Sequence, residues 1–260
     1  MLSFLRSSII EKITKSNIFI LYISNYLIRY FRFFLLPYEK EWNVFKHIKI
    51  SNNDIILDIG AHWGESVLTF RKYYTNIIYS YEPDTDSFKH LKKISKNKNV
   101  KCFNYGINKY KKKIKLYFPS FKKNKLTLWG CANLDRLKRR INNFTYLDSE
   151  KIQYVSNMYS FKNINLKEAI GIIKIDVEGS EYEVLKGINR ESIRKSKLIF
   201  LEYHPENFQK CNNFLKNIGF KCFLFRNERL KKVNLKQILK EVKYKKNTTN
   251  VIFKRNNVLI

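Results

Sequence analysis

Glycine, proline and cysteine are all scarce in this chain of 260 residues, and each shortage excludes a class of protein. With 8 Gly and 4 Pro, the chain is neither collagen-like nor a Pro/Gly-rich low-complexity sequence. The 4 Cys form no C-x-x-C pair, and their spacing matches neither a zinc ribbon nor a small disulfide scaffold. We therefore expect reduced thiols in a cytoplasmic protein. Global disorder is excluded, because 44% hydrophobic and 15% aromatic residues are enough for a full core.

Acidic residues are also few: 51 Lys and Arg face 22 Asp and Glu, which leaves a net charge of +29. Such a surface attracts polyanions such as RNA, DNA or anionic lipid headgroups. The excess is mostly Lys, in a chain that is also rich in Asn and Ile and poor in Ala and Gly. Compositional drift along the whole chain therefore gives the same charge equally well, and the charge alone assigns no function.

The N-terminal residues 1–40 differ from the rest and form a hydrophobic and basic segment. Ile18–Pro37 is long enough to span a bilayer as a helix of about 20 residues. However, Arg29 and Arg32 lie on one stripe of that helix, and each would cost about 2.5–3.5 kcal/mol at the bilayer centre. A helix packed on the domain and a helix in the membrane interface both fit better than a span, and no signal-peptide cleavage site follows. Residues 17–37 are thus a candidate for peripheral membrane contact.

Residues 41–260 are interpreted as one α/β domain, because short apolar runs alternate with helical stretches. Strands joined by single helices imply right-handed crossovers and a doubly wound, mostly parallel sheet with helices on both faces. A basic insertion at residues 109–140 holds 12 basic residues and one acid, Asp135. We expect it to form an extra hairpin and a loop between the third and fourth strands. The seven expected strands are 55–59, 77–81, 100–103, 172–175, 198–203, 220–225 and 251–253.

The sharpest local pattern follows the first expected strand, in the run DIGAHWG from Asp58 to Gly64. Gly60 and Gly64 allow a tight strand-to-helix turn that a ligand can approach closely. The free amide groups of the next helix would point at that ligand. Neither a G-x-G-x-x-G pattern nor a P-loop lysine is present. Asp58 would repel a pyrophosphate, and it suits a ligand that carries an ammonium group.

Glu82 ends the second expected strand, about 20 residues after the turn, where an acid can accept both hydroxyls of a ribose. The alternative, that Glu82 caps the following helix, is weakened because Asp86 already occupies a capping position. A glycine turn, an acidic residue placed to accept ribose hydroxyls, and alternating strands and helices together indicate an adenosine ligand. Asp58 indicates that the part of the ligand beyond the adenosine is zwitterionic. S-adenosylmethionine (SAM) meets these requirements better than NAD.

Four blocks of the sequence resemble the FkbM family of SAM-dependent methyltransferases, which has the class I methyltransferase fold, a seven-stranded Rossmann-like sheet. The third block is the most specific, because the family pattern K-x-D-x-E-G-x-E-x-x-x-L-x-G is intact in it. Two positions depart from the family pattern: His62 replaces the usual Asn of the glycine turn, and Met158-Tyr159 stand where Leu-Asp commonly precede the fourth strand. The blocks are DIILDIGAHWGESVLTF (54–70), YEPDTDSFKHLKK (81–93), GIIKIDVEGSEYEVLKGI (171–188) and LIFLEYHP (198–205).

The resemblance implies which residues bind the cofactor SAM. Residues of the glycine turn would surround its methionine portion, Glu82 would take the ribose, and Gly106 would let the adenine approach the backbone. No metal site is implied, although a divalent cation is compatible with this arrangement. The implied cofactor-binding residues are Asp58, Gly60, Ala61, His62, Gly64, Glu82 and Gly106.

Three residues at the ends of the fourth and fifth strands are candidates for catalysis. Asp176 closes the fourth strand at the mouth of the expected cleft, where it could orient the acceptor hydroxyl, hold the methionine amino group or bind a divalent cation. Glu202 and His204 end the fifth strand on one face, and a neutral His is suited to act as a general base for an alcohol. Glu178 and Glu181 would complement the dipole at the start of the next helix.

The leading hypothesis is a SAM-dependent O-methyltransferase that acts on a hydroxyl of a small molecule or a glycan. Methyl transfer from a sulfonium needs alignment and a base rather than a nucleophilic Ser or Cys, for which no motif exists. An RNA or DNA methyltransferase is the second hypothesis, but no recognition-helix or RNP pattern accompanies the basic segments, so nucleic acid is the less favoured partner. The third is a non-catalytic, membrane-associated nucleoside-binding protein, against which Asp58 and Glu82 argue.

Overall fold

The computed structural model describes residues 40–121, 124–127, 130–142, 153–245 and 250–255. The residues before position 40, which include the candidate membrane contact at 17–37, lie outside this part of the chain. Among the helices that are described, none is both long enough and apolar enough to cross a bilayer.

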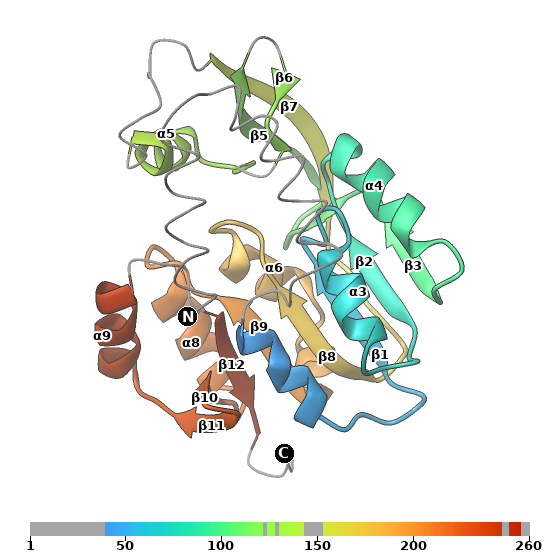
Figure 1. Ribbon diagram of the computed structural model, residues 1–260, viewed down its shortest axis with the longest axis vertical. Coiled ribbons are helices and arrows are strands. Elements are labelled where there is room, and N and C mark those ends of the chain that lie inside the picture. The colour runs from blue at the N-terminus through green and yellow to red at the C-terminus, as the bar shows by residue number, and fades with distance from the viewer. Residues whose placement is uncertain (1–39, 122–123, 128–129, 143–152, 246–249, 256–260) are drawn as a thin grey trace, which may run out of the picture.

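An eight-stranded sheet forms the body of the structure, in the order β11-β10-β12-β9-β8-β1-β2-β3 (Figure 1). The five strands from β9 to β3 are parallel, whereas β12, β10 and β11 join them by antiparallel pairing. The mostly parallel α/β fold is therefore confirmed. The strands are β1 Ile55–Ile59, β2 Ile78–Tyr81, β3 Val100–Phe103, β8 Ile170–Ile175, β9 Leu198–Glu202, β10 Lys221–Arg226, β11 Arg229–Lys232 and β12 Asn250–Lys254.

The eighth strand, β11, is not among the seven that the sequence predicts. It pairs with β10 through Arg226 and Arg229, and the two residues between them, Asn227 and Glu228, both have positive φ angles of 52° and 59°. A two-residue turn in which both residues are left-handed matches the right-handed twist of paired antiparallel strands. The basic chain after Arg226 therefore returns along the edge of the sheet.

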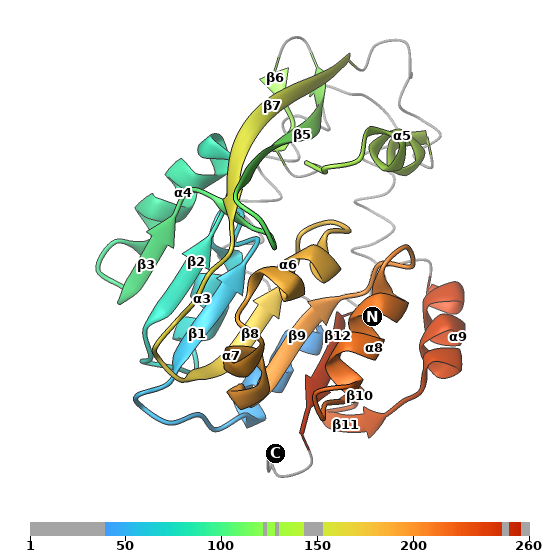
Figure 2. The same cartoon turned by 180° about the vertical axis from the view of Figure 1, so that it is seen from behind.

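Helices cover both faces of the main sheet, because its central strands are apolar and buried on both sides. Side chains alternate between two cores, so that Ile56 lies in one and Leu57 in the other. Figure 2 shows the second face, with its helices in front of the sheet. The core around Ile56 is covered by η1 Lys40–His47, α3 Glu65–Arg71 and α4 Thr85–Ser95, and the core around Leu57 by α6 Glu181–Gly187, α7 Arg190–Lys195, α8 Phe208–Lys216 and α9 Leu235–Lys245.

The chain between β3 and β8 builds a second, four-stranded sheet in the order β4-β7-β5-β6. The segment 109–140 supplies β5, β6 and most of α5, whereas β7, the antiparallel partner of β5, follows it. This layer rises beyond the carboxyl ends of β1, β2 and β8, at the top of Figure 1. We call residues 108–162 the insertion. The elements are β4 Gly106–Ile107, β5 Lys112–Phe121, β6 Asn124–Lys125, α5 Leu134–Asn142 and β7 Gln153–Lys162.

Candidate active site

A cleft lies between the carboxyl ends of β1, β2 and β8 and the insertion above them, with about 1180 Å³ of empty space including its open mouth. This is the edge at which open parallel sheets bind ligands. Six of the residues predicted to form the site line the cleft: Gly60, Ala61, His62, Glu82, Gly106 and Asp176. The other four, Asp58, Gly64, Glu202 and His204, are not among its lining residues.

The glycine turn after β1 is shaped by close backbone packing. Gly60 has a φ of 78°, and a Cβ atom there would lie 1.8 Å from the carbonyl oxygen of Asp176. Only glycine therefore lets the end of β1 pass the end of β8 so closely. Gly64, with a φ of 99°, begins helix α3. The two glycines thus bring the backbone of β1 and the amino end of α3 to the floor of the cleft.

Glu82 is buried at the end of β2 and lines the cleft, with 6% of its surface exposed. Its two carboxylate oxygens accept hydrogen bonds from the amides of His62, at 2.9 Å, and Asp84, at 2.7 Å. Burial raises the pKa of this carboxyl to about 7. Because each carboxylate oxygen can accept more than one hydrogen bond, Glu82 keeps acceptor capacity for a ligand hydroxyl.

The prediction that Asp86 caps helix α4 is wrong. The helix begins at Thr85, and its cap is Asp84, whose carboxylate accepts from the amide of Ser87 at 3.0 Å. Asp86 lies in the first turn, where a negative charge favours the helix dipole. Glu82 does not cap this helix either, because one of its oxygens accepts from the Asp84 amide that precedes it.

A buried lysine occupies the position in which the ligand ammonium was expected. The Nζ of Lys174 lies 3.5 Å from Asp58 Oδ1 and 3.5 Å from Asp176 Oδ2, and it donates to the carbonyl oxygen of Gly60 at 2.8 Å. Burial opposes the charge on Lys174, but Asp176 and Asp58 raise its pKa above the ordinary value. Burial raises the pKa of Asp58, although Lys174 opposes this effect. Lys174 therefore stands between Asp58 and the cleft.

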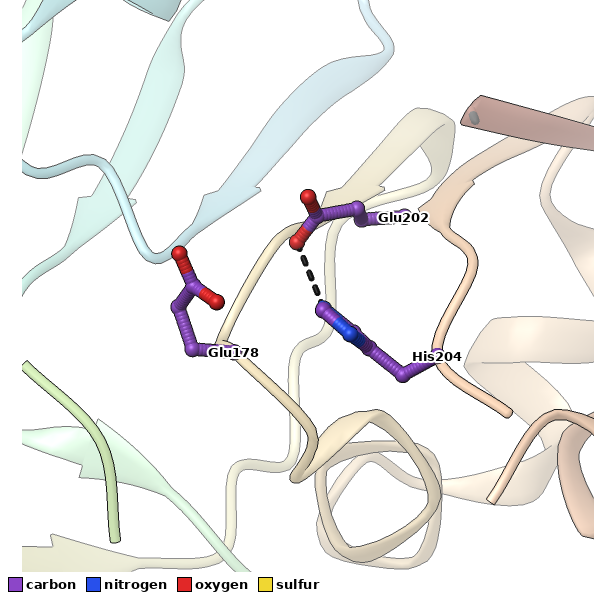
Figure 3. A group of neighbouring side chains, drawn as sticks. All are labelled: Glu178, Glu202 and His204. Atoms are coloured by element: carbon purple, nitrogen blue, oxygen red, sulfur yellow. Dashed lines mark hydrogen bonds and ion pairs between the residues drawn. The ribbon is translucent and has the colours of Figure 1, made fainter. Parts of the chain in front are cut away.

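Figure 3 shows three neighbouring side chains, Glu178, Glu202 and His204, whose nearest ligand atoms lie within 4.8 Å of one another, and Glu178 also lines the cleft. Their donor types and spacing are compatible with a divalent cation. In the structure, His204 Nε2 bonds Glu202 Oε2 at 2.6 Å, and the guanidinium of Arg136 lies 3.8 Å from Glu178 Oε2. The positive charge beside these residues is thus already supplied by the insertion.

Neither ring nitrogen of His204 is available to a substrate in this arrangement. Nε2 bonds Glu202, and Nδ1 contacts the guanidinium of Arg136. Burial lowers the pKa of His204, with 3% of the residue exposed, so the ring is neutral. A catalytic role for His204 and Glu202 stays a prediction, and the geometry favours a positioning role over direct proton transfer.

Sequence reasoning missed the residues that join the insertion to the main sheet. Lys125 of β6 lies 2.5 Å from Asp84 Oδ1 and 2.7 Å from Asp86 Oδ2, and the hydroxyl of Tyr159 donates to Asp84 Oδ1 at 2.6 Å. Tyr159 belongs to one of the two departures from the family pattern. A tyrosine hydroxyl at this position was the sequence signal from which a polar contact could have been predicted. Lys174 also carried a signal, because it is the only charged residue in the buried strand β8.

Carboxyl groups outnumber lysines and arginines in the lining of the cleft, whereas the whole chain has an excess of Lys and Arg. The ionisable lining of the cleft includes one lysine, Lys174, against five carboxyl groups. The roof supplied by β5 is apolar, with Ile114, Leu116 and Phe118 facing the cleft. The acids that line it are Glu65, Glu82, Asp84, Asp176 and Glu178.

The fold is a Rossmann-like α/β domain with a cleft at the carboxyl ends of its parallel strands, where such sheets bind ligands. The family model of the methyltransferase FkbM domain matches residues 58–222, and the chain belongs to this family. It is therefore a SAM-dependent methyltransferase, with SAM as its methyl donor. The search of curated protein sequences gives no match.

Several solved structures are similar to this chain at low identity. Precorrin-6y C5,15-methyltransferase from Geobacter metallireducens GS-15 is 10% identical with a TM-score of 0.43, over 85% of this chain and 92% of that one. SMU.1697c from Streptococcus mutans, solved in complex with SAH, is 10% identical with a TM-score of 0.43, over 84% and 99%. The fibrillarin pre-rRNA processing protein of Methanococcus jannaschii is 13% identical with a TM-score of 0.41, over 82% and 73%.

Proposed function

We propose that the chain transfers the methyl group of SAM to a hydroxyl of a small molecule or a glycan. The observation that supports this most is the composition of the cleft lining, which holds five carboxyl groups and one lysine although the chain carries +29. Two of these carboxyl groups, Asp84 and Glu178, are paired with the cations Lys125 and Arg136 of the insertion, and the other three leave the cleft acidic. An acidic, apolar-roofed cleft disfavours the phosphates of a nucleic acid and suits a neutral acceptor with hydroxyl groups.

The residues of the cleft fit SAM. His62 Nε2 is buried in the cleft wall and has no hydrogen-bond partner among the described residues, so it offers a polar contact to a ligand. Glu82 would accept the ribose hydroxyls, and Lys174 would face the methionine carboxylate. Gly106 would border the adenine; a Cβ atom there would also meet the Phe161 ring at 2.1 Å, so packing alone requires glycine. When bound, SAM supplies a methyl group that is already electrophilic.

The glycine turn would hold the methionine portion, with one change from the sequence-based assignment. Gly60, Ala61 and His62 line the cleft, whereas Asp58 lies behind Lys174. Asp58 would therefore act on the ligand through Lys174, whose ammonium it holds in place. A buried cation held by two carboxylates keeps one orientation, and this order would align the ligand.

Asp176 would orient the acceptor hydroxyl and receive its proton. Its side chain is 32% exposed and lines the cleft. Burial opposes its ionisation, but Lys174 holds the pKa of Asp176 below the ordinary value, so the group is an anion at neutral pH. A positioned carboxylate with no covalent step is what methyl transfer from a sulfonium requires, because most of the acceleration comes from alignment in a water-poor pocket.

Two further partners are proposed with less support. RNA or DNA is favoured by the net charge of the whole chain, and its binding should weaken steeply with salt. Anionic membrane is favoured by the basic, apolar segment 17–37, which would place the enzyme peripherally on the bilayer and would make a lipid-linked acceptor more accessible.

The proposed function is tested by incubating the full chain with SAM and separate panels of glycans, small hydroxylated molecules and RNA, and measuring the mass gain of one CH₂ by mass spectrometry. We expect hydroxyl acceptors to gain mass. Asp176→Asn should lower turnover about a hundredfold or more, and it should weaken the SAM affinity measured by calorimetry far less than that. Glu191→Gln, an exposed carboxyl on α7 away from the cleft, is the matched control. Mass gain on RNA alone, or full turnover by Asp176→Asn, would contradict the proposal.

A further inference from the structure

A row of polar side chains connects the insertion to the cleft carboxylate Asp176. It begins at Arg136 on helix α5, whose guanidinium reaches the end of β9 and contacts His204 Nδ1. The same guanidinium lies 3.8 Å from Glu178 Oε2 and 3.5 Å from Glu206 Oε2. With 15% of its side chain exposed, Arg136 is largely enclosed by these groups. The insertion therefore places one cation beside Glu178, a residue that lines the cleft.

The chemistry of arginine fixes the direction of the first two hydrogen bonds in this row. A guanidinium has five N–H donors and no acceptor, so His204 Nδ1 must accept from Arg136. The ring proton of the neutral His204 then sits on Nε2, which donates to Glu202 Oε2 at 2.6 Å. His204 is buried, so water does not offer an alternative partner that would reverse this direction.

The last members of the row are Glu202 and Asp176, which lie side by side because each directly follows the paired residues Leu201 of β9 and Ile175 of β8. The proximity of the two carboxyl groups shifts both of their pKa values. Burial raises the pKa of Glu202 well above its ordinary value, and the charge of Asp176 adds to this, so Glu202 is the protonated partner. Its hydroxyl therefore donates to the Asp176 carboxylate. Each donor in the row points towards the cleft.

Other charged groups around Asp176 act in the same sense. Lys174 approaches Asp176 from β8, and the charges of His62 and His204 also stabilise its anion when they are present. Glu178 and Glu181 face Glu202, and both favour its neutral form. The same two carboxyl groups and Asp176 also face His204, with Glu181 Oε1 at 3.5 Å from its Nε2, and they oppose the lowering of its pKa by burial and by Arg136. These surroundings assign the negative charge to Asp176 and the proton to Glu202.

We propose that Arg136 is a positioning residue through which the insertion orients the Asp176 carboxylate towards the acceptor hydroxyl. The catalytic consequence rests on the proposed function, whereas the hydrogen-bond row does not. The row depends on helix α5, because Arg136 is the one member of the row that the insertion supplies. Without the guanidinium, His204 Nδ1 is free to take a proton, and the direction of the row is no longer fixed.

The row is tested directly by nitrogen NMR of the histidines in the full chain, which contains only 4 His. We expect His204 to hold its proton on Nε2 and to stay neutral below the ordinary pKa of about 6.5. In Arg136→Ala the pKa of His204 should rise, because a neighbouring cation has been removed. Arg139→Ala is the matched control, since Arg139 is on the same helix, reaches Glu206 at 4.0 Å and has an exposed side chain.

Two further measurements separate this proposal from the proposed function. Arg136→Ala should change SAM affinity by less than about twofold, lower kcat at least about tenfold and shift the pH profile of kcat. Arg136→Lys, which keeps a donor-only cation, should recover part of kcat. A His204 proton on Nδ1 in the parent chain, or an unchanged His204 titration in Arg136→Ala, would overturn the row even if hydroxyl acceptors are methylated. The expected titrations, without methylation of any hydroxyl acceptor, would confirm the row and overturn only the proposed function.

Discussion

Lowering the pH from about 8 to about 5 should weaken SAM binding about a hundredfold through Glu82 alone. Burial raises the pKa of this carboxyl to about 7, and its ionised form is the one that accepts hydrogen bonds from ribose hydroxyls. Below the pKa, the carboxyl must lose a proton before it accepts both hydroxyls, and each pH unit costs about 1.4 kcal/mol. Because the pKa is raised to about 7, affinity is nearly complete at about pH 8 and is lost as the pH falls through 7.

Calorimetry with SAM across this pH range measures the effect, with Glu82→Gln as the matched variant. The amide keeps the size of the side chain and removes the titration, so we expect weaker binding at high pH and a much flatter pH dependence. Glu191→Gln should behave like the parent chain, because this exposed carboxyl does not line the cleft. A flat profile in the parent chain, or the same slope in Glu82→Gln, would refute the assignment of Glu82 to the ribose.

Three other results are expected. Gly60→Ala should lower the free energy of unfolding in urea by about 3 kcal/mol or more, because the added Cβ would lie 1.8 Å from a carbonyl oxygen. The control Gly219→Ala, also at positive φ but 3.4 Å from a flexible arginine side chain, should cost about 1–2 kcal/mol. Equal losses in the two variants would show that the clash at Gly60 relaxes. Lys174→Met should lower the free energy of unfolding by about 3–5 kcal/mol, because it leaves Asp58 without its cation. Adding Asp58→Asn to this variant should restore more than half of the lost stability. If the losses of the two single variants simply add, the ion pair between Lys174 and Asp58 is not what stabilises them. In liposome flotation with anionic vesicles, the full chain should float and a chain without residues 1–37 should not; equal partitioning would refute the membrane contact.

The architecture was predictable because it depends on patterns that are local in the sequence. Short apolar runs such as Ile55–Ile59 can be buried on both sides only in a covered parallel sheet. The glycine turn and Glu82 lie at the ends of adjacent strands, so any parallel sheet brings them to one edge. That is why the cleft and most of its predicted lining could be found without coordinates.

The charged contacts were not predictable because they join residues far apart in sequence. Asp58 was expected to meet a ligand ammonium, but the closest ammonium comes from Lys174, more than a hundred residues later. Arg136 and Lys125 belong to a stretch so rich in basic residues that no single one stood out. Which of these side chains forms a buried contact depends on how the insertion folds back, and this is a tertiary property.

The insertion leaves and re-enters the main body at one point, because its last strand, β7, is paired with β4, the strand that directly precedes the insertion. Gly106 is opposite Phe161 and Ile107 is opposite Lys162. A segment whose two ends are already neighbours can be lengthened, shortened or replaced with little entropic penalty for closing the chain. Grafting residues 108–160 from one family member onto another would then exchange the roof over the acceptor while the glycine turn and Glu82 stay unaltered, so new methylation targets could evolve without rebuilding the donor pocket.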